Sequence, residues 1–378
     1  MAFPLSNYFS RLTRHLRGMD WALFLCVFGL VLLGLAAIYS VELSQEAVEF
    51  VHVKKQVAAL LLGVGVFLVV MPSNYRLLQN YAQVLYLVCL VLLIGVLLFG
   101  QTVRGATGWY VMGPVSFQPV EFMKIALIIA LSTYFARRGK RAFDLRTFFE
   151  TAVISFLPVG CVLFQPDFGS AAILVGIWMF FLLYAGMPWR YVLGMVGLAA
   201  LTFMLSWNFF FADYQRARIL TFIDPTMDPL GQGYNVTQAI IAIGSGQWFG
   251  SGLGFGTQSQ LKFLPESQTD FIFAVVSEEL GFFGAALLVG AFALIFFRLF
   301  QQASRATDDF TCYLLLGMVT LFFLQFLVNI GMNLGLFPVT GIGLPFVSYG
   351  GSSLVAMMTL FAIAQSVAAR SRSSYGML

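Results

Sequence analysis

The sequence predicts an all-α polytopic membrane protein with about ten transmembrane helices. Of its 378 residues, 60% are hydrophobic and only 10% are charged, whereas soluble domains carry about 25% charged residues. The mean hydropathy of +0.87 agrees with this class. The apolar residues also gather in runs of roughly 20 residues, the length that crosses a bilayer as a helix. An ordinary soluble enzyme is excluded, because 17 Asp and Glu are too few to solvate a globule of this length.

Ten apolar runs define the candidate spans. Each is expected to be a helix, because a helix is the open-chain structure that pairs all of its backbone groups inside hydrocarbon. The segment before the first run, residues 1–20, is polar and basic, so the first run is expected to be a retained helix rather than a cleaved signal peptide. The runs cover residues 21–41, 56–71, 80–100, 118–136, 150–165, 169–187, 191–211, 270–299, 310–332 and 350–369.

The distribution of Lys and Arg predicts the orientation of the chain. The whole chain, 1–378, is expected to form one membrane domain with cytoplasmic tails at 1–20 and 370–378. This placement puts all but seven of the 21 basic residues inside, as the positive-inside rule requires. Because the basic residues are spread over short connections and do not gather on one face, a nucleic-acid partner is not expected. The seven exceptions are Lys54, Lys55, Arg104, Lys124, Arg216, Arg218 and Lys262.

The connection between the seventh and eighth spans, residues 212–269, is much longer than the others. Long connections in compact domains are usually functional. This one carries Arg216, Arg218 and Lys262 together with a run of glycines. Glycine-rich backbone beside fixed cations is typical of sites that hold phosphorylated ligands. Function is therefore expected at the extracytoplasmic face, whose other segments are 101–117, 165–170 and 333–349.

Carboxylates at the ends of apolar spans are candidates for function, because a charge in the membrane is costly. Asp270 begins the eighth span, and Asp167 follows Pro166 before the sixth. Both positions also suit a helix N-cap, where a carboxylate accepts hydrogen bonds from free backbone amides. For Asp270 a cap and a catalytic role are compatible, whereas for Asp167 the cap is favoured.

Further acids lie within the spans. Glu121 and Lys124 are spaced i, i+3 on the helix that begins at Gln118, so they are expected to face each other. This pair is either a local ion pair or a substrate contact. Glu278 and Glu279 lie deeper in the eighth span, where they are expected to support polar contacts between helices or to reach a water-filled cavity.

Several motifs, in a fixed order along the chain, resemble those of one family. They are Phe117-Gln118-Pro119 with Glu121 and Lys124, Gln165 to Gly169, Gly231 to Tyr234, Phe263 to Ala274, Asn329 to Met332, and Ser348 to Ser353. Together they extend over essentially the whole chain and resemble the SEDS family (shape, elongation, division and sporulation). The run from Thr340 to Ser348 is more similar to the RodA elongation branch than to the FtsW division branch.

The resemblance implies a ten-helix enzyme that polymerises lipid II into peptidoglycan glycan strands, for cell-wall elongation and cell shape. The implied place is the outer face of the cytoplasmic (inner) membrane, with membrane lipid around the protein. The implied partner is a class B penicillin-binding protein, which cross-links the strands.

The resemblance also places the essential acid of the family at Asp270. Polymerisation needs a base for the attacking sugar hydroxyl and cations for the departing polyprenyl pyrophosphate. A divalent cation, Mg²⁺ or Mn²⁺, is the one cofactor considered. The candidate cationic side chains are Arg216, Arg218, Lys262 and Lys124.

The remaining candidates are assigned lesser roles. Glu121 and Lys124, with Gln118, are the second candidates for contact with substrate, and Asp167, Glu278 and Glu279 are expected to support the structure. The family commonly has basic residues where this chain has Gly108 and Ser116, so cationic charge in that outer loop is reduced.

Two other functions remain open at this point. A lipid II flippase would use intramembrane acids to couple substrate movement, and would need polar groups near the midplane and on the inner face. A scaffold that activates a penicillin-binding protein would not need an acid in a groove with cations. Composition and topology alone do not separate these from an enzyme.

Overall fold

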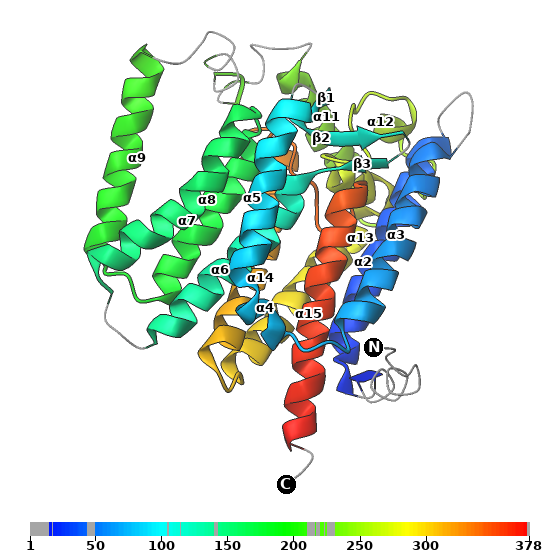
Figure 1. Cartoon of the computed structure of the whole chain (residues 1–378). Coiled ribbons are helices and arrows are strands. Elements are labelled where there is room, and N and C mark those ends of the chain that lie inside the picture. The colour runs from blue at the N-terminus through cyan, green and yellow to red at the C-terminus, as the bar shows by residue number, and fades with distance from the viewer. Residues whose placement is uncertain are drawn as a thin grey trace.

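The computed structural model describes residues 15–16, 18–43, 50–103, 106–113, 115–139, 143–209, 216, 220–222, 224 and 231–375. Nearly all of the regular structure is helical (Figure 1). In chain order the elements are α2 (Trp21–Leu43), α3 (Val51–Val70), α4 (Arg76–Asn80), α5 (Ala82–Phe99), β1 (Gln101–Val103), β2 (Ala106–Met112), β3 (Val115–Phe117), α6 (Pro119–Arg138), α7 (Leu145–Phe164), α8 (Phe168–Tyr184), α9 (Trp189–Phe209), α11 (Gln232–Ser245), α12 (Thr257–Gln260), α13 (Ile272–Ser304), α14 (Asp309–Asn333) and α15 (Gly351–Tyr375).

Nine helices in the described part of the chain are long and apolar enough to cross a membrane. They match nine of the predicted spans, with shifted ends: the second runs Val51–Val70 rather than 56–71. The sixth predicted span, 169–187, is the shorter helix α8, whose 17 residues lie at the lower end of the spanning range. The membrane-protein class is confirmed.

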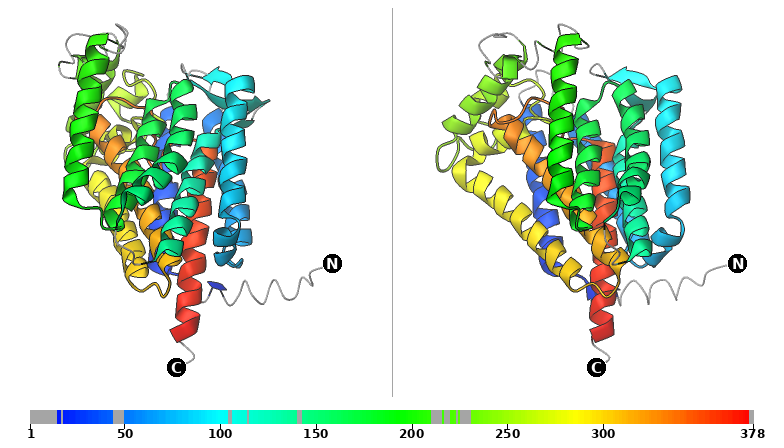
Figure 2. Two further views of the ribbon diagram at one scale, coloured as in Figure 1. Left: turned by 60° about the vertical axis from the view of Figure 1, so that its left-hand side comes forward. Right: turned by 90° about the vertical axis from the view of Figure 1, so that its left-hand side faces the viewer.

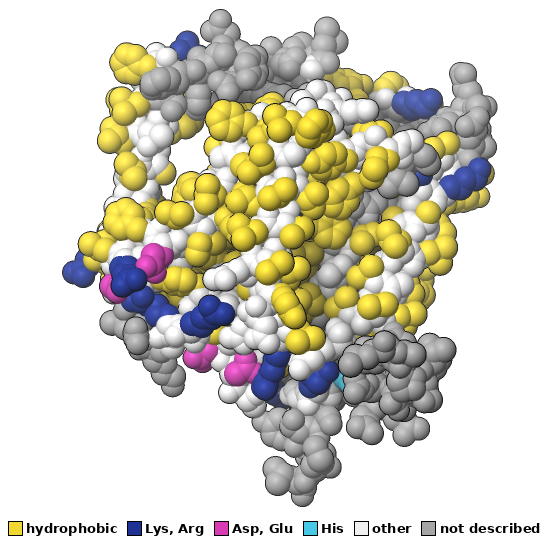
Figure 3. Space-filling view, in the orientation of Figure 1, with side chains coloured by type: hydrophobic (Ala, Val, Ile, Leu, Met, Phe, Trp, Pro, Cys, Tyr) yellow, Lys and Arg dark blue, Asp and Glu magenta, His cyan; other side chains and the backbone are white. Residues whose placement is uncertain are grey.

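The helices α15, α6 and α14 are the most buried of the spanning helices and form the centre of the bundle. Helix α15 packs along α3, and α13 packs against both α14 and α2. Helix α9 stands at the edge of the bundle, and none of the residues in its most apolar stretch is buried (Figures 1 and 2). Figure 3 shows apolar side chains over the middle of one face, with charged side chains toward its ends. This surface suits lipid as the solvent.

Residues 101–117, expected as an outer connection, contain short strands. This segment forms a small antiparallel sheet of order β1-β2-β3, in which Gln101 lies opposite Trp109 and Tyr110 lies opposite Phe117. The hydroxyl of Tyr110 donates to the carbonyl of Leu92 at 3.0 Å. The sheet is thereby attached to α5 at one end of the bundle.

Helix α13 is broken at Gly281, whose φ of 66° and ψ of −161° are not helical. A Cβ on Gly281 would lie 2.3 Å from the nitrogen of Gly250, so the close approach requires glycine. The loop 247–252 pairs the backbone at this break, and Phe282 N donates to the carbonyl of Gln247 at 2.7 Å. Irregular backbone at membrane depth is tolerated when it is paired inside the protein. The other pairs are Phe283 N to Trp248 O, Ser251 N to Glu278 O and Gly252 N to Glu279 O.

The predicted loop 212–269 is more than a loop in its described part, because it contains α11 and α12. Helix α11 packs on α13 and α14. Its Ala239 and Ala242 are fully buried, whereas Ile240 and Ile241 are about half exposed. This amphipathic helix therefore covers the bundle with its small residues.

The predicted tails, 1–20 and 370–378, are described only in part. Helix α15 continues to Tyr375, so the described part of the predicted tail at 370–378 is helical. At the other terminus, Asp20 is buried, and its backbone nitrogen donates to Gln365 Oε1 on α15 at 2.8 Å. The start of α2 and the last turns of α15 therefore lie at the same end of the bundle (Figure 2).

Candidate functional site

Asp270 lies where the long connection enters α13. Its side chain is half-buried, and its carbonyl accepts hydrogen bonds from Asn329 Nδ2 at 3.0 Å and Asn333 Nδ2 at 2.9 Å. Both asparagines are fully buried on α14. The predicted N-cap at Asp270 is wrong, because α13 begins later and has Phe271 at its N-cap position. The backbone of Asp270 is instead fixed from a neighbouring helix.

The segment that leads into α15 links the Asp270 region to the start of α6. The hydroxyl of Ser348 donates to the carbonyl of Thr269 at 2.6 Å. Further along the same segment, the hydroxyl of Ser352 accepts from the backbone nitrogen of Gln118 at 3.1 Å. The structure thus brings Asp270 and Gln118 to the same end of the bundle, the end that carries the sheet (Figure 1).

The first turns of α6 carry a buried ion pair. Lys124 Nζ lies 2.7 Å from Glu121 Oε1, and the Lys124 side chain is 0% exposed. The predicted contact between these two side chains is present. Glu121 Oε2 is buried and has no hydrogen-bond partner within the described structure. An unsatisfied buried oxygen calls for an explanation such as a water, an ion or a ligand.

The turn before Asp270 carries Lys262. Lys262 has a φ of 58° and Glu266 a φ of 54°, a region that side-chain-bearing residues rarely occupy. Such strained backbone clusters at functional sites. The carbonyl of Glu266 accepts from Asp270 N at 3.1 Å, so this turn runs directly into the candidate acid. Arg216 is half-buried, and Arg218 lies outside the described residues.

The three acids that were expected to be supporting residues each bind to neighbouring elements. Asp167 accepts from Ser170 N at 2.9 Å and is the N-cap of α8, as its position predicts. Glu278 accepts from two backbone amides at the start of α12, the nearer at 2.7 Å. Glu279 accepts from the hydroxyl of Ser40 on α2. These contacts join α12, α2 and the kinked part of α13.

Sequence reasoning missed two groups beside the site. Asn329 and Asn333 are spaced i, i+4 inside an apolar span, and this spacing of polar side chains was the available signal. Glu42 is fully buried at the end of α2 and accepts from His52 N at 2.6 Å and from His52 Nδ1 at 2.8 Å. The His52 ring packs edge-on against Tyr349, with ring centroids 4.8 Å apart. This contact ties α3 to the segment that holds Thr269.

A metal site made of protein side chains alone is not found in the part of the chain that the structure describes. No group of three or more His, Cys, Asp and Glu side chains there is placed to hold a metal ion. Mg²⁺ is commonly bound by one or two carboxylates together with substrate phosphates. Asp270 is a carboxylate of that kind, so it suits a cation that the substrate brings.

Gly108, where a basic residue is common in the family, lies in β2 against the start of α6. A Cβ at this position would lie 3.2 Å from Gln165 Oε1 and 4.0 Å from Gln118 Nε2. An arginine there would meet both glutamines. The space beside Gln118 is therefore filled by neutral amides in this chain.

Comparisons with known proteins agree with this arrangement. Residues 20–373 match the model of a family described as cell cycle proteins and named for FtsW, RodA and SpoVE. The chain is 40% identical over 363 residues to a probable peptidoglycan glycosyltransferase FtsW from Thiomicrospira cyclica, which covers 92% of this chain and 90% of that protein. It is 38% identical over 314 residues to the peptidoglycan glycosyltransferase MrdB of Escherichia coli K12, which covers 83% of this chain and 85% of that protein.

A solved structure has the same architecture. It is described as showing structural coordination of polymerization and crosslinking by a peptidoglycan synthase complex. Its TM-score with this chain is 0.80 at 32% identity, and the match covers 93% of this chain and 98% of that chain. Relatives of the FtsW and MrdB types both match over most of the chain, so the RodA-like branch stays a prediction. The family itself is established: the chain belongs to the FtsW/RodA/SpoVE family, which is the SEDS family that its motifs resemble.

Proposed function

We propose that the chain is a peptidoglycan glycosyltransferase that polymerises lipid II, with Asp270 as its general base. Curated relatives that match most of the chain carry the name peptidoglycan glycosyltransferase. The assignment of Asp270 rests on the way this residue is held. Its side chain is half-buried, and its backbone carbonyl accepts hydrogen bonds from two buried asparagines. A base whose backbone is fixed in this way needs little rearrangement before reaction.

In the proposed reaction the GlcNAc 4-hydroxyl of one lipid-linked disaccharide attacks the MurNAc anomeric carbon of another. Asp270 takes the hydroxyl proton as the new carbon–oxygen bond forms. The bond between the anomeric carbon and the pyrophosphate oxygen breaks, and polyprenyl pyrophosphate leaves with the electron pair. Because the donor linkage is α and the product bond is β, a single inverting displacement is sufficient.

The leaving pyrophosphate needs positive charge beside it. Lys262 is the best-supported candidate, because it is exposed in the strained turn that runs into Asp270. Arg216 and Arg218 are further candidates on the same connection, acting directly or with Mg²⁺ or Mn²⁺. The buried pair of Glu121 and Lys124, with Gln118 beside it, is the second group proposed to contact substrate.

The proposal places the reaction at the extracytoplasmic face of the cytoplasmic (inner) membrane, with both termini in the cytoplasm. A class B penicillin-binding protein is the proposed partner, and the chain is assigned to cell elongation and cell shape. The partner is supported by the similar solved structure, which is described as a peptidoglycan synthase complex that coordinates polymerization and crosslinking.

The test is lipid II polymerisation by the purified full chain in liposomes, with and without a class B penicillin-binding protein. We expect glycan strands from the wild type and none from Asp270→Asn. The matched control is Asp167→Asn, which makes the same carboxylate-to-amide change at a helix cap, where Asn serves as well as Asp. Strand synthesis by Asp270→Asn would remove this residue from the role of base. Repeating the assay with a chelator tests the divalent cation.

The same preparation separates the competing functions. A flippase would move labelled lipid II across the liposome and form no strands under any condition. A scaffold would raise the activity of the penicillin-binding protein equally with wild type and with Asp270→Asn. Either result would overturn the polymerase proposal.

A charge reversal tests the cation beside the leaving group. Lys262→Glu should raise the lipid II concentration needed for half-maximal rate by at least about tenfold, because it places a negative charge beside pyrophosphate. The control is Arg137→Glu, which lies at the far end of α6. Equal effects of the two reversals would contradict the assignment of Lys262.

A further inference from the structure

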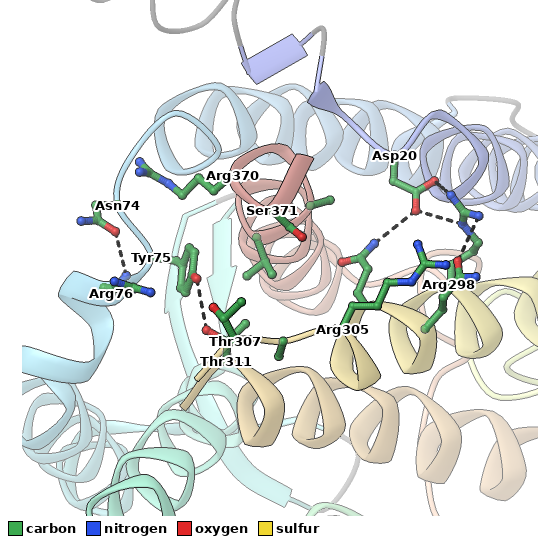
Figure 4. Close-up of a pocket in the computed structure, with 15 residues that line it drawn as sticks. Asp20, Asn74, Tyr75, Arg76, Arg298, Arg305, Thr307, Thr311, Arg370 and Ser371 are labelled. Atoms are coloured by element: carbon green, nitrogen blue, oxygen red, sulfur yellow. Dashed lines mark hydrogen bonds and ion pairs between the residues drawn. The ribbon is translucent and has the colours of Figure 1, made fainter. Parts of the chain in front are cut away.

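A polar cavity (Figure 4) takes no part in the proposed reaction and lies beside α4, at the end of the bundle opposite the sheet (Figure 1). Its volume is about 320 Å³, at the lower end of the range for ligand pockets. The cavity opens among α4, the last turns of α13 and α15, and the start of α14. Helix α4, the junction of α13 with α14, and α15 are distant in sequence, so the tertiary fold brings their side chains together.

Four arginines from three parts of the chain line this cavity. Arg76 begins α4, Arg298 lies in the last turns of α13, Arg305 follows α13, and Arg370 lies on α15. Figure 4 shows Arg76 and Arg370 on one side of the cavity, and Arg298 and Arg305 on the other. The positive-inside rule accounts for basic residues at a membrane end. It does not require that four of them surround one cavity.

Asp20, the one acid among the described lining residues, already accepts hydrogen bonds from other residues of the protein. It accepts from Arg298 Nη2 at 2.7 Å, from Arg298 Nε at 2.9 Å, and from Gln302 Nε2 at 3.2 Å. Leu23 N donates a further hydrogen bond at 3.2 Å. These bonds occupy the acceptor positions of a carboxylate. Asp20 therefore neutralises Arg298 and has no capacity left for the other guanidinium groups.

Arg76 and Arg305 are less well neutralised than Arg298. Arg76 lies 3.3 Å from Asp308, in a pair whose arginine side chain is 60% exposed. Arg370 Nη2 donates to the carbonyl of Ser73, a neutral acceptor, at 3.2 Å. Arg305 is exposed and forms no ion pair within the described ranges. The described residues that line the cavity therefore include four arginines and one acid, Asp20.

We propose that this cavity binds a phosphate group carried by an organic molecule. Guanidinium groups recognise phosphate oxygens through paired, charge-assisted hydrogen bonds. The hydroxyl of Thr307, which is exposed, lines the same space and supplies a neutral donor, whereas the hydroxyl of Thr311 is already bonded to Asp308. Gln302 also lines the cavity, and its Oε1 has no hydrogen-bond partner within the described structure. The apolar side chain of Val367 faces the organic part.

Two sources share this chemistry. One is the headgroup of an anionic phospholipid in the adjacent leaflet, and the other is a soluble phosphate compound. The experiment measures the binding of two probes, dihexanoyl phosphatidylglycerol and inorganic phosphate, to the purified full chain by isothermal titration calorimetry. We expect saturable binding of at least one probe, weakened by added sodium chloride because the contact is ionic.

The variant that tests the site is Arg305→Gln, because this side chain is exposed and its loss should not disturb the fold. We expect its dissociation constant to rise about tenfold or more, as for loss of a charge-assisted hydrogen bond. The matched control is Arg190→Gln at the start of α9, an exposed arginine that lies over the Tyr191 ring and outside the cavity. The control should bind like the wild type.

Each outcome decides the proposal. Binding of the lipid probe alone identifies a phospholipid headgroup site, binding of inorganic phosphate alone identifies a soluble ligand, and binding of both supports a site for either source. No saturable binding of either probe overturns the proposal, and so does an equal loss in the Arg305 and Arg190 variants. The readout involves no polymerisation, so failure of the proposed enzymatic function would leave it unaffected.

Discussion

The Lys124 ammonium is enclosed in the first turns of α6, with Glu121 as its counter-ion at 2.7 Å. Two charges removed from water are costly, and their attraction repays the cost only while both are present. One oxygen of Glu121 remains unsatisfied within the described residues. This pair therefore keeps two charged side chains near the candidate site, and their burial costs the folded protein stability.

Removing one partner of this pair should therefore cost more than removing both. Glu121→Gln leaves a buried, uncompensated ammonium, and we expect it to lower the free energy of unfolding by roughly 3–5 kcal/mol. The double variant Glu121→Gln with Lys124→Met should recover most of that loss. Equilibrium unfolding of the purified protein in mixed micelles measures both. Equal destabilisation of the single and double variants would contradict a buried ion pair.

Asp20 gives a pH dependence with a defined sign. Burial acts to raise the pKa of Asp20, but hydrogen bonds from Arg298 and Leu23 and the charge of Arg298 outweigh it, so the pKa lies below its ordinary value of 3.8. A pKa lowered by folding contributes stability that is present above the unfolded-state value and is lost as pH falls through the folded-state value.

We therefore expect the thermal unfolding midpoint of the wild type to fall as the pH drops below about 4. Asp20→Asn should have a lower midpoint at neutral pH, because Arg298 loses its partner, and should lack part of the acid-dependent fall. Asp309→Asn, an exposed acid at the start of α14, is the control. If the unfolding midpoint of Asp20→Asn fell with acid as much as that of the wild type, Asp20 would not be the source of the acid-dependent loss of stability.

At the residue scale, local pairs were predictable and distant ones were not. The contact of Glu121 with Lys124 follows from helical spacing, and the cap at Asp167 follows from the preceding proline. The bond from Asn329 to the carbonyl of Asp270 spans 59 residues, so no local pattern encodes it. A sequence can mark Asn329 as unusual in an apolar span but cannot name its partner.

At the scale of elements, the break in α13 decides how the long connection is used. The loop 247–252 lies against the break and forms hydrogen bonds with the backbone groups of α13 that the break leaves without helical partners. Because Gly281 combines a positive φ with contact to Gly250, both the conformation and the space depend on a missing side chain. The helix and the loop therefore stabilise each other.

The variant Gly281→Ala tests whether the positive φ and the close contact with Gly250 matter more than the higher helix propensity of alanine. Its Cβ would lie 2.3 Å from Gly250 N, and we expect a loss of at least about 2 kcal/mol of unfolding free energy from strain and lost backbone pairing. Gly290→Ala on the same helix, where no atom lies within 4 Å of the added Cβ, should be neutral or stabilising. Thermal unfolding in detergent measures both. Equal midpoints for the two variants would show that the break is not required.

The sequence predicts those helices whose position is determined by a long apolar run. The eighth apolar run, 270–299, predicts α13 but not its break, because a glycine does not interrupt an apolar run. The sheet at 101–117 was missed because a short outer connection carries no spanning signal, and its pairing depends on contact with α5. The helix α11 lies in the connection 212–269, which the sequence marks as long and glycine-rich, and its packing on α13 is a tertiary contact.

At the scale of the whole molecule, the two ends of the bundle differ in chemistry. One end carries Asp270, the sheet and the strained turn at Lys262, and the other carries the arginine-lined cavity. The charge pattern predicts that the first end faces outward and the second faces the cytoplasm. The orientation of the chain is a prediction that labelling can test.

A pair of single-cysteine variants tests that orientation, with the four native cysteines replaced by alanine. Gln101→Cys lies exposed on the sheet, and Arg190→Cys lies exposed at the opposite end of the bundle. A membrane-impermeant maleimide applied to intact spheroplasts should label only the first, and permeabilised cells should show both. Labelling of Arg190→Cys alone in intact spheroplasts would reverse the topology and place Asp270 in the cytoplasm.

The bonds that hold Asp270 also impose an order on biosynthesis. A ribosome adds Asp270 59 residues before Asn329 and 63 residues before Asn333. The hydroxyl of Ser348, which binds the carbonyl of Thr269, is added later still. A growing chain therefore carries the candidate acid through the membrane machinery without the geometry to use it. Any reaction must wait until α14 and the segment that leads into α15 have joined the bundle, which makes correct assembly a precondition of activity.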